Sequence, residues 1–526
     1  MKTEKKMNRR KFVAHSVAAL AAGQTAFAFR RSRTQRPLCN YRIAYNDDGH
    51  TLQHSSGLDD LLKKGVDCFI GTQVDALFWS VGHSDIYLFD TKTGEMFGRH
   101  VKQFDNASEY RLHRGLQSVL NDRRDYVQAM ADRAREIGIH FFASFRMNDC
   151  HDSPEGWNSR DQYSQFKKAH PELLLGKSVH PAFATGFDFS YPESRQNKFQ
   201  VIEEVVHTYD VDGIELDFLR HPAFFKPDEA FRHRHLITGL VQRVRALLDE
   251  VGTSRGKPIR LALRVPFTFE LAYKLGLDAP AWMEEGLADV VTAGTPRGHE
   301  LDLSMSEYVE ATRGKPLTLL GQIGLYHPPE QTRATALNYW KQGVHGIYLF
   351  NWYAPLRNRD QWRESLLEIG DPSLLNYRNK QYVFDKQIGS MWTRSHPKAQ
   401  LPLEIQIAKL GAAAAIEFHI GDDVQAAAAA GYAARCKLVT RFEDAMEDDD
   451  LQIKLNGVVL SQEQGETEYK PTLFSKEDWF HLPFKAQLLK TGLNRLEFIL
   501  LARNHRVAAP LTLADMSVWI DYETRT

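Results

Sequence analysis

The chain has 526 residues, of which 43% are hydrophobic and 25% are charged, a composition that excludes a disordered or collagen-like protein. Lysine and arginine number 66 and aspartate and glutamate number 67, so the formal net charge is −1. No overall basic field is therefore available for binding nucleic acid nonspecifically. The four cysteines include no CxxC pair, which excludes zinc-site spacing and implies no disulfide framework.

Residues 1–35 have the pattern of an export signal. Arg9 and Arg10 precede a weakly apolar, alanine-rich run from Ala14 to Phe29, and Ala26-Phe27-Ala28 offers small residues for cleavage. Paired arginines before a modest apolar run are typical of twin-arginine signal peptides. We therefore expect a bacterial protein that is periplasmic or secreted; the alternative is a basic N-terminal helix. No other segment reaches the roughly 18 apolar residues of a membrane span, so none is predicted.

Short apolar runs alternate with helical patterns between residues 36 and 372. Helical periodicity is found over Arg123–Ile137, Arg195–Tyr209, Glu229–Val251 and Gln331–Gln342. Strand–helix alternation of this length predicts a (β/α)₈ TIM barrel. A doubly wound sheet is the alternative, but it would need a glycine-rich phosphate loop that this sequence lacks. The predicted strands are Arg42–Asp47, Asp75–Val81, His140–Met147, Gly213–Phe218, Ile259–Val265, Ala288–Ala293, Pro316–Gln322 and Gly346–Trp352.

The pattern changes near Asp371-Pro372. From about residue 380 the helical stretches become few and alternating segments dominate, which predicts a C-terminal antiparallel β-sandwich over residues 380–526. Asn456-Gly457 between two such segments is a strong hairpin signal. The alternating segments include Leu403–Ile407, Ala415–Ile420, Cys436–Phe442, Leu451–Leu455, Asn494–Leu501 and Asp515–Tyr522.

Polar side chains gather at the predicted carboxyl ends of the barrel strands, where TIM barrels carry their active sites. Carboxylates, bidentate hydrogen-bonding groups and aromatic rings together suit a carbohydrate, so a carbohydrate substrate is the expected partner. We expect Trp79 and Trp352 either to stack against sugar rings or to belong to the core. We predict substrate contacts from Asp47, Trp79, Arg146, Asn148, Asp149, His151, Arg220, His221, Arg264, Gln322, Tyr326, Asn351 and Trp352.

The segment from Asp212 to His221, DGIELDFLRH, is the most informative. Strand alternation places Glu215 and Asp217 on one face, pointing into the barrel, and the aliphatic residues between them on the other. Two carboxylates buried so close together are costly unless they are paired or functional. We expect Asp217 to be catalytic; the alternative is a structural ion pair with Arg264 or Arg146.

The stretch GIELDFLRH resembles the fourth-strand motif of the α-amylase superfamily, in which the nucleophile corresponds to Asp217. Glu215 departs from that motif, where the superfamily has arginine. The stretch also resembles the chitinase signature, but Leu219 stands at the position of the catalytic glutamate. Across the barrel the chain looks most like bacterial glycosyl-hydrolase-like TIM-barrel proteins described as family-10-hydrolase-like. The segments that carry this resemblance are Phe141–Asp149, Asp212–Phe218 and Arg264–Asp278.

A glycosidase of this kind needs a second carboxylate. The amylase-like arrangement places the general acid after the fifth strand, where Glu270 follows Arg264-Val265-Pro266. Glu270 is equally suited to the first turn of a helix, where the helix dipole favours an acidic residue. Glu215 and Asp149 are the other candidates for the acid.

These residues predict a glycoside hydrolase of an extracellular poly- or oligosaccharide, working without a cofactor. Two alternatives stay open: a noncatalytic carbohydrate-binding protein on a barrel scaffold, and a barrel lyase or metal-dependent hydrolase. A metal site at Asp149, His151 and Asp152 lacks a closed set of ligands, so no metal is predicted.

Overall fold

The computed structural model describes residues 38–526 except for 84, 155–158, 325–326, 353–358, 387–397, 406–408, 472–475 and 525–526. The predicted export signal lies outside the described residues. Within them, no helix is both long enough and apolar enough to cross a membrane. Residues Cys39–Thr526 form one compact unit, so the domain boundaries at 372 and 380 stay predictions. All four cysteines are free thiols.

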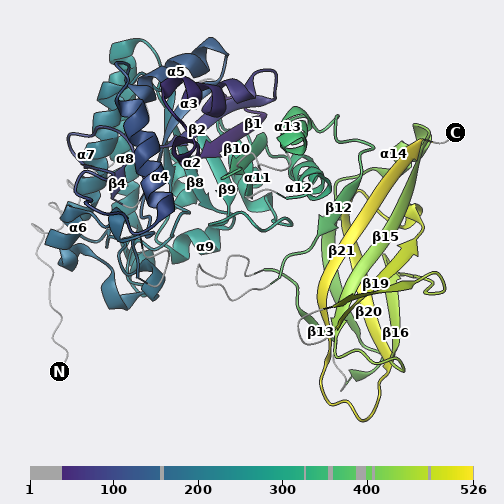
Figure 1. Ribbon diagram of the computed structural model, residues 1–526. Coiled ribbons are helices and arrows are strands. Elements are labelled where there is room, and N and C mark those ends of the chain that lie inside the picture. Colours follow the sequence, from purple (N-terminus) through teal and green to yellow (C-terminus); the bar gives the residue numbers. More distant parts are fainter. Residues whose placement is uncertain are drawn as a thin grey trace, which may run out of the picture. The chain divides into compact units, whose positions relative to one another are not determined.

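Parallel strands close into a barrel of eight, which confirms the predicted TIM-barrel class (Figure 1). The order around the barrel is β1-β11-β10-β9-β8-β7-β6-β2. Each predicted strand matches an observed one to within two residues at either end. The barrel strands are β1 (Ile43–Asp47), β2 (Val74–Ser80), β6 (His140–Arg146), β7 (Gly213–Asp217), β8 (Arg260–Pro266), β9 (Val290–Gly294), β10 (Thr318–Gly324) and β11 (Gly346–Phe350).

Helices cover the outer side of the barrel and bury their apolar faces against it. Local signals set their ends: Asp125 caps α5 by accepting a hydrogen bond from the backbone N–H of Val127 at 2.9 Å, and the chain leaves that helix through Gly138 at φ 81°. The covering helices are α3 (Leu58–Gly65), α5 (Tyr126–Glu136), α7 (Pro192–Thr208), α8 (Ala230–Arg255), α10 (Ala279–Glu284), α11 (Ser306–Thr312), α12 (Pro329–Gln342) and α13 (Arg359–Glu368).

Longer connections after several strands carry additional elements. An unpredicted helix, α4, begins after Asn106, a cap that accepts from the backbone N–H groups of Ser108 and Glu109. This cap places Glu109 in the first helical turn. The additional elements are α2 (His50–Gln53), β3 (Gly82–His83), β4 (Ile86–Tyr87), β5 (Glu95–Met96), α4 (Ala107–Leu120), α6 (Gln165–Ala169) and α9 (Phe269–Lys274).

Strand alternation separates two apolar regions in the barrel. Outward side chains such as Ile214, Leu216 and Leu77 join the core beneath the helices. Inward side chains form a smaller cluster that includes Phe78 and Phe142, whose rings stack with centroids 4.4 Å apart. Polar residues on this inward face therefore lie inside the barrel or at its open end.

The C-terminal region is an antiparallel β-sandwich, as predicted. Its apolar core includes Leu438, Phe498 and Val518. Asn456 and Gly457, at φ 51° and 84°, make the predicted hairpin. One sheet has the order β12-β21-β15-β19-β18, with β13 on β21, and the other β14-β20-β16-β17. The elements are β12 (Lys380–Val383), β13 (Leu403–Ile405), β14 (Ala413–Ile420), α14 (Val424–Ala429), β15 (Tyr432–Glu443), β16 (Asp450–Leu455), β17 (Val458–Val459), β18 (Glu466–Pro471), β19 (Lys476–Phe484), β20 (Gly492–Ala502) and β21 (Leu511–Thr524).

Candidate active site

Glu215 and Asp217 both point into the barrel from β7, as strand alternation predicts. Their neighbours are inward side chains of other strands: Ser144 and Tyr348 contact Glu215, and Arg264 contacts Asp217. We call Glu215, Asp217, Arg264 and Gln322 the buried layer, because each is at most 2% exposed.

Asp217 is held in an ion pair with Arg264. The Nη1 of Arg264 lies 2.7 Å from Oδ1 and 2.8 Å from Oδ2 of Asp217. Oδ1 also accepts from the backbone N–H groups of Leu219 and Arg220 at 2.9 and 3.2 Å. This is the structural alternative that the sequence left open for Asp217, and it buries the carboxylate with its charge balanced.

Arg264 extends this interaction to the loop after β9. Its Nη2 donates to the carbonyls of Thr295 and Pro296 at 2.9 and 3.2 Å. Its Nε donates to Oε1 of Gln322 at 3.0 Å, and the guanidinium lies 3.8 Å from the ring centroid of Phe350. The ion pair therefore holds the loop that continues to Arg297 and His299.

Glu215 lies next to this pair as a neutral acid. Burial, together with the nearby charge of Asp217, raises the pKa of Glu215 to about 8, although hydrogen bonds from Ser144 and Tyr348 oppose the shift. Those donors approach Oε2 at 2.5 and 3.1 Å. Oε1 has no hydrogen-bond partner among the described residues. Glu215 is therefore protonated at neutral pH.

A separate pocket of about 510 Å³ opens at the carboxyl ends of the strands. We call it the mouth pocket. Its walls come from the ends of β1, β6 and β11, the loops after β7 and β9, and the helices α2 and α4. Asp217 and Glu215 do not line it. The lining residues are Asp48, Gly49, His50, Gln53, His83, Ser108, Glu109, Leu112, Arg146, His151, Gln162, Arg220, Arg297, His299, Phe350 and Asn351.

Asp48 presents a carboxylate to the mouth pocket. Its side chain is 17% exposed, whereas that of Arg146 is 2% exposed. Oδ2 of Asp48 accepts from Nη2 of Arg146 and from Nδ2 of Asn351, both at 3.0 Å. Asn351 reaches it through a left-handed backbone conformation, φ 49°. These two donors fix the orientation of the carboxylate.

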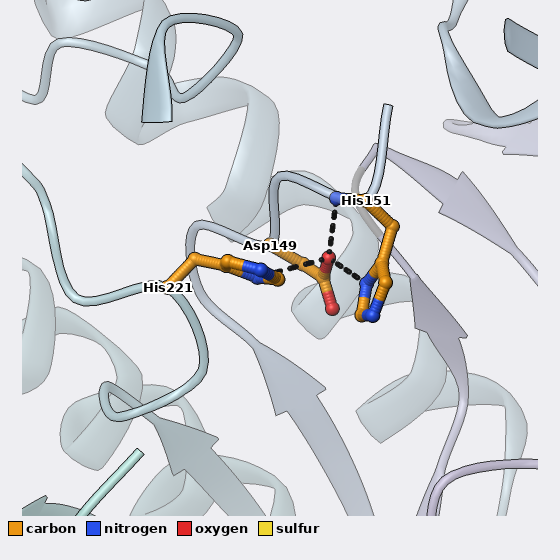
Figure 2. A group of neighbouring side chains, drawn as sticks. All are labelled: Asp149, His151 and His221. Atoms are coloured by element: carbon orange, nitrogen blue, oxygen red, sulfur yellow. Dashed lines mark hydrogen bonds and ion pairs between the residues drawn. The ribbon is translucent and has the colours of Figure 1, made fainter. Parts of the chain in front are cut away.

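Beside Asp48 lies a second network, in which the Asp149 carboxylate sits between two imidazole rings (Figure 2). Oδ2 of Asp149 accepts from Nη1 of Arg146 at 3.0 Å, and Oδ1 accepts from the backbone N–H of His151 at 3.0 Å. Oδ1 also contacts Nδ1 of His151, and Nδ1 of His221 lies 3.3 Å away. His221 enters this network through φ 54°.

His151 connects Asp149 to the pocket wall. Its Nε2 accepts from Nη2 of Arg220 at 2.8 Å. Burial lowers the pKa of His151 well below its ordinary value, Arg220 acts in the same direction, and Asp149 opposes. The neutral ring therefore carries its proton on Nδ1, toward Asp149, and His151 and Arg220 form one hydrogen-bonded part of the wall.

Asp149, His151 and His221 have ligand atoms within 4.8 Å of one another, which is metal-like spacing. Their partners do not suit a cation. Arg146 donates to Asp149 and Arg220 donates to His151, so two guanidinium groups adjoin the cluster. The Nδ1 of His221 already accepts from the backbone N–H of Cys150 at 3.1 Å. The donor set fits a hydrogen-bond network rather than a metal centre.

Three buried acceptor oxygens on pocket-lining residues have no donor among the described residues. They are Oδ1 of Asn351, Oε1 of Gln162 and Oε2 of Glu109. The other oxygen of Glu109, Oε1, accepts from Ser159 at 2.8 Å and from Gln162 at 3.0 Å. A buried acceptor left without a donor costs on the order of 1–3 kcal/mol. Each of these three atoms is covered by protein, so a ligand that brings hydrogen-bond donors meets them only when the side chains turn toward the pocket.

Several of the predicted substrate-binding and catalytic residues lie away from the mouth pocket. Trp79 and Trp352 are fully buried in the core beneath the helices, so their predicted role as sugar-stacking platforms is wrong for this structure. On β2, Trp79 alternates with the inward Phe78; after β11, the turn at Asn351 directs Trp352 outward. Glu270 lies exposed in the first turn of α9, paired with Lys274 at 2.6 Å, the helical position that was its alternative.

Other predicted contacts have structural partners. Asp47 points outward and caps the turn into α2, accepting from the backbone N–H of Gly49 at 2.9 Å. Burial, the largest effect, raises the pKa of Asp47 to about 6, although a hydrogen bond from Thr51 opposes it. Asn148 links two loops, exchanging hydrogen bonds with Phe187 at 2.8 and 2.9 Å. Tyr326 lies outside the described residues.

Asp48 and Glu109 line the mouth pocket but are outside the predicted set of site residues. A signal for Asp48 was available, because the alternation that turns Ala44 inward continues through Asn46 to Asp48, and not to Asp47. Glu109 follows the nearest barrel strand by almost thirty residues and had no comparable signal.

No protein-family model matches this chain, and no curated protein matches it. Membership of a family-10-hydrolase-like group therefore stays a prediction. The chain is similar to several solved glycoside hydrolase structures. Alpha-L-fucosidase isoenzyme 2 from Paenibacillus thiaminolyticus is 15% identical with a TM-score of 0.38, the match covering 64% of this chain and 49% of that one. This chain thus spans about half of the fucosidase.

Two further similar structures are matched over nearly their full length. A family 18 N-acetylglucosaminidase from Paenibacillus barengoltzii is 14% identical with a TM-score of 0.35, over 62% of this chain and 100% of that one. The PgaB (BpsB) glycoside hydrolase domain from Bordetella bronchiseptica is 11% identical with a TM-score of 0.39, over 62% and 99%. At these identities no substrate or residue role is carried over, and the site is argued from its own geometry.

Proposed function

We propose that the protein is a glycoside hydrolase, acting on a poly- or oligosaccharide outside the cytoplasm, and that the mouth pocket binds its substrate. The cellular location rests on the twin-arginine pattern at Arg9-Arg10. The activity rests on the position of the pocket at the carboxyl ends of the barrel strands and on the groups that converge there.

The three buried acceptors carry this proposal. Oδ1 of Asn351, Oε1 of Gln162 and Oε2 of Glu109 come from separate elements but line the same pocket. A sugar offers a row of hydroxyl groups, each able to donate one hydrogen bond and accept others. Once these side chains turn toward the cavity that they line, several separate acceptors suit a polyhydroxylated ligand better than an apolar one.

Two carboxylates, Asp48 and Glu109, line the pocket, which is the number that glycoside hydrolysis requires. Arg146 and Asn351 hold Asp48 in one orientation, so we assign it the role of nucleophile or base at the anomeric carbon. We assign Glu109 the role of general acid. Its carboxyl group would deliver a proton to the glycosidic oxygen as the C–O bond breaks.

Asp217 remains the alternative nucleophile. The resemblance to the amylase motif supports that role, and one of its oxygens, Oδ2, accepts only from Arg264 among the described residues. In the structure its side chain is 2% exposed and does not line the mouth pocket. For Asp217 to reach a sugar, the lining side chains above it must move.

A noncatalytic carbohydrate-binding protein is the second candidate function. The observation that favours it is the closed Asp217–Arg264 pair, together with Leu219 at the position of the chitinase glutamate. Such a protein would bind sugars in the same pocket without cleaving them.

The test is to incubate the purified protein with a panel of plant, algal and bacterial polysaccharides and to measure reducing ends and product masses. The Asp48→Asn/Glu109→Gln double variant serves as the inactive control. New reducing ends from the wild type alone would support the proposed hydrolase. Binding of a polysaccharide without cleavage would support the noncatalytic alternative, and neither binding nor cleavage would contradict both.

A further inference from the structure

The charge of the mouth pocket indicates which sugars it takes. Three of its lining residues, Arg146, Arg220 and Arg297, are arginines, against the two carboxylates of Asp48 and Glu109. Arginine stays protonated at any ordinary pH. Burial lowers the pKa values of His50 and His299, which also line the pocket, so these rings are neutral at pH 7. Because Arg146 is paired with both Asp48 and Asp149, the lining arginines considered for an anionic ligand are Arg220 and Arg297.

The arginines occupy different parts of the wall. Arg146 lies between Asp48 and Asp149, 3.0 Å from an oxygen of each. Arg220 is brought to the pocket by the turn after β7, where its backbone N–H is bound to Asp217 and its side chain donates to His151. Arg297 comes from the loop after β9.

Arg297 is on a supported loop. Arg264 donates to the carbonyls of Thr295 and Pro296, the two residues immediately before Arg297. Nε2 of Gln322 also donates to the Thr295 carbonyl at 2.9 Å. Holding this loop limits the backbone freedom of Arg297, which lowers the entropic cost of binding an anionic group with its side chain.

The described lining also lacks an aromatic platform for a neutral sugar. Phe350 is its only phenyl or indole ring, and the guanidinium of Arg264 covers a face of that ring at 3.8 Å. The described lining residues offer a sugar hydrogen bonds and charge.

We propose that the substrate is an acidic carbohydrate, whose anionic substituent is bound by Arg220 and Arg297 while its hydroxyl groups meet the buried acceptors. The substituent is a planar carboxylate or a sulfate ester, since both match the guanidinium fork. This inference rests on the proposed function, because it names the substrate class of the same pocket.

The test is affinity gel electrophoresis of the full chain in polygalacturonate, in alginate, in a sulfated galactan, and in neutral xylan and galactan, at low and high salt. We expect retardation by at least one acidic polymer and a weaker effect at high salt. Retardation by polygalacturonate or alginate would identify the bound substituent as a carboxylate, and retardation by the sulfated galactan would identify it as a sulfate ester. Arg220→Gln and Arg297→Gln should each weaken binding about tenfold or more, the loss of a charge-assisted hydrogen bond.

Arg313→Gln is the matched control, because Arg313 is exposed and pairs only with Glu310 among the described residues. Melting temperatures identify a variant that fails to fold. If Arg220→Gln fails to fold, the binding measured for Arg297→Gln alone tests the inference. Equal or stronger retardation by neutral polymers, or acidic binding that both pocket variants retain, would overturn the inference and leave the proposed hydrolase intact. If no polymer binds and none is cleaved, the proposed function fails as well.

Discussion

Glu215 and Asp217 in the buried layer, and Asp48 and Glu109 in the mouth pocket, are two carboxylate pairs at the same end of one barrel. Asp217 forms an ion pair with Arg264, and the neighbouring Glu215 is protonated. In the mouth pocket, the Asp48 side chain is 17% exposed, and Oε2 of Glu109 has no donor among the described residues. The first pair lies inside the barrel beside Arg264, whereas the residues of the second pair line a cavity.

The difference shows that a motif in a strand does not by itself locate the chemistry. DGIELDF places both carboxylates inside the barrel, but the partners that decide their role, Arg264 and Tyr348, come from other strands. Through Arg264, the buried layer supports the loop that carries Arg297 to the pocket. We infer that the buried layer shapes the site and that the mouth pocket performs the reaction.

Replacing Asp48 is the test that best distinguishes which of the two carboxylate pairs performs catalysis. Asp48→Asn retains the shape of the side chain but removes the negative charge that we propose acts on the anomeric carbon of the sugar. We expect turnover to fall by about a thousandfold, which corresponds to about 4 kcal/mol of transition-state stabilisation. The measurement is steady-state hydrolysis of the best substrate of the panel, with the exposed Asp132→Asn as control. Near-normal turnover would instead indicate that Asp217 is the nucleophile.

Asp217→Asn should act chiefly on stability. It leaves the guanidinium of Arg264 buried without its carboxylate, a change that costs about 3–5 kcal/mol in other proteins. Urea unfolding of the variant measures this loss. Adding Arg264→Gln should recover part of it, because the unpaired charge is then absent. A thousandfold loss of turnover with an unchanged free energy of unfolding would instead support the nucleophile assignment of the amylase-like motif.

Glu109→Gln should have a smaller effect that depends on the leaving group. Without the acid, we expect turnover on natural substrates to fall about a hundredfold, while activated aryl glycosides keep most of their rate because their leaving groups need little protonation. Rates on a series of aryl glycosides measure this dependence. An equal loss on every leaving group would show that Glu109 only binds the sugar.

The barrel could be predicted because its signals are local. The apolar runs from Arg42–Asp47 to Gly346–Trp352 and the intervening helical periodicity are properties of adjacent residues, and alternation correctly turned Glu215 and Asp217 inward. The same rule, applied to Trp79, would have placed it outward beside Leu77. For Trp79, strand position outweighs residue type.

The site depended on contacts that no local pattern contains. Glu109 reaches the pocket only because α4 returns over the strand ends. Arg264 is the register partner of Asp217 on the adjacent strand β8, which decides between the two pairings that the sequence left open, with Arg264 or with Arg146. The turn at Asn351, at φ 49°, separates the pocket-facing Asn351 from the buried Trp352. Such geometry follows from the assembled barrel, and the sequence could only place these residues near strand ends.

Glu215→Gln should give the smallest effect, a change in how stability depends on pH. Because the folded-state pKa of Glu215 is raised from 4.5 to about 8, the folded protein keeps a proton that the unfolded chain releases. This group therefore contributes stability that is complete below about pH 4.5, declines as pH rises toward 8, and changes little above that. Glutamine stays neutral and can still accept from Ser144 and Tyr348, so the variant should lose this part of the decline and become the more stable protein, relative to wild type, as pH increases. Melting temperatures from pH 5 to 9 measure the slope, with the exposed Glu270→Gln as control. Parallel curves for wild type and Glu215→Gln would mean that Glu215 is already ionised at pH 5, and the buried layer would then hold two negative charges against the single guanidinium of Arg264.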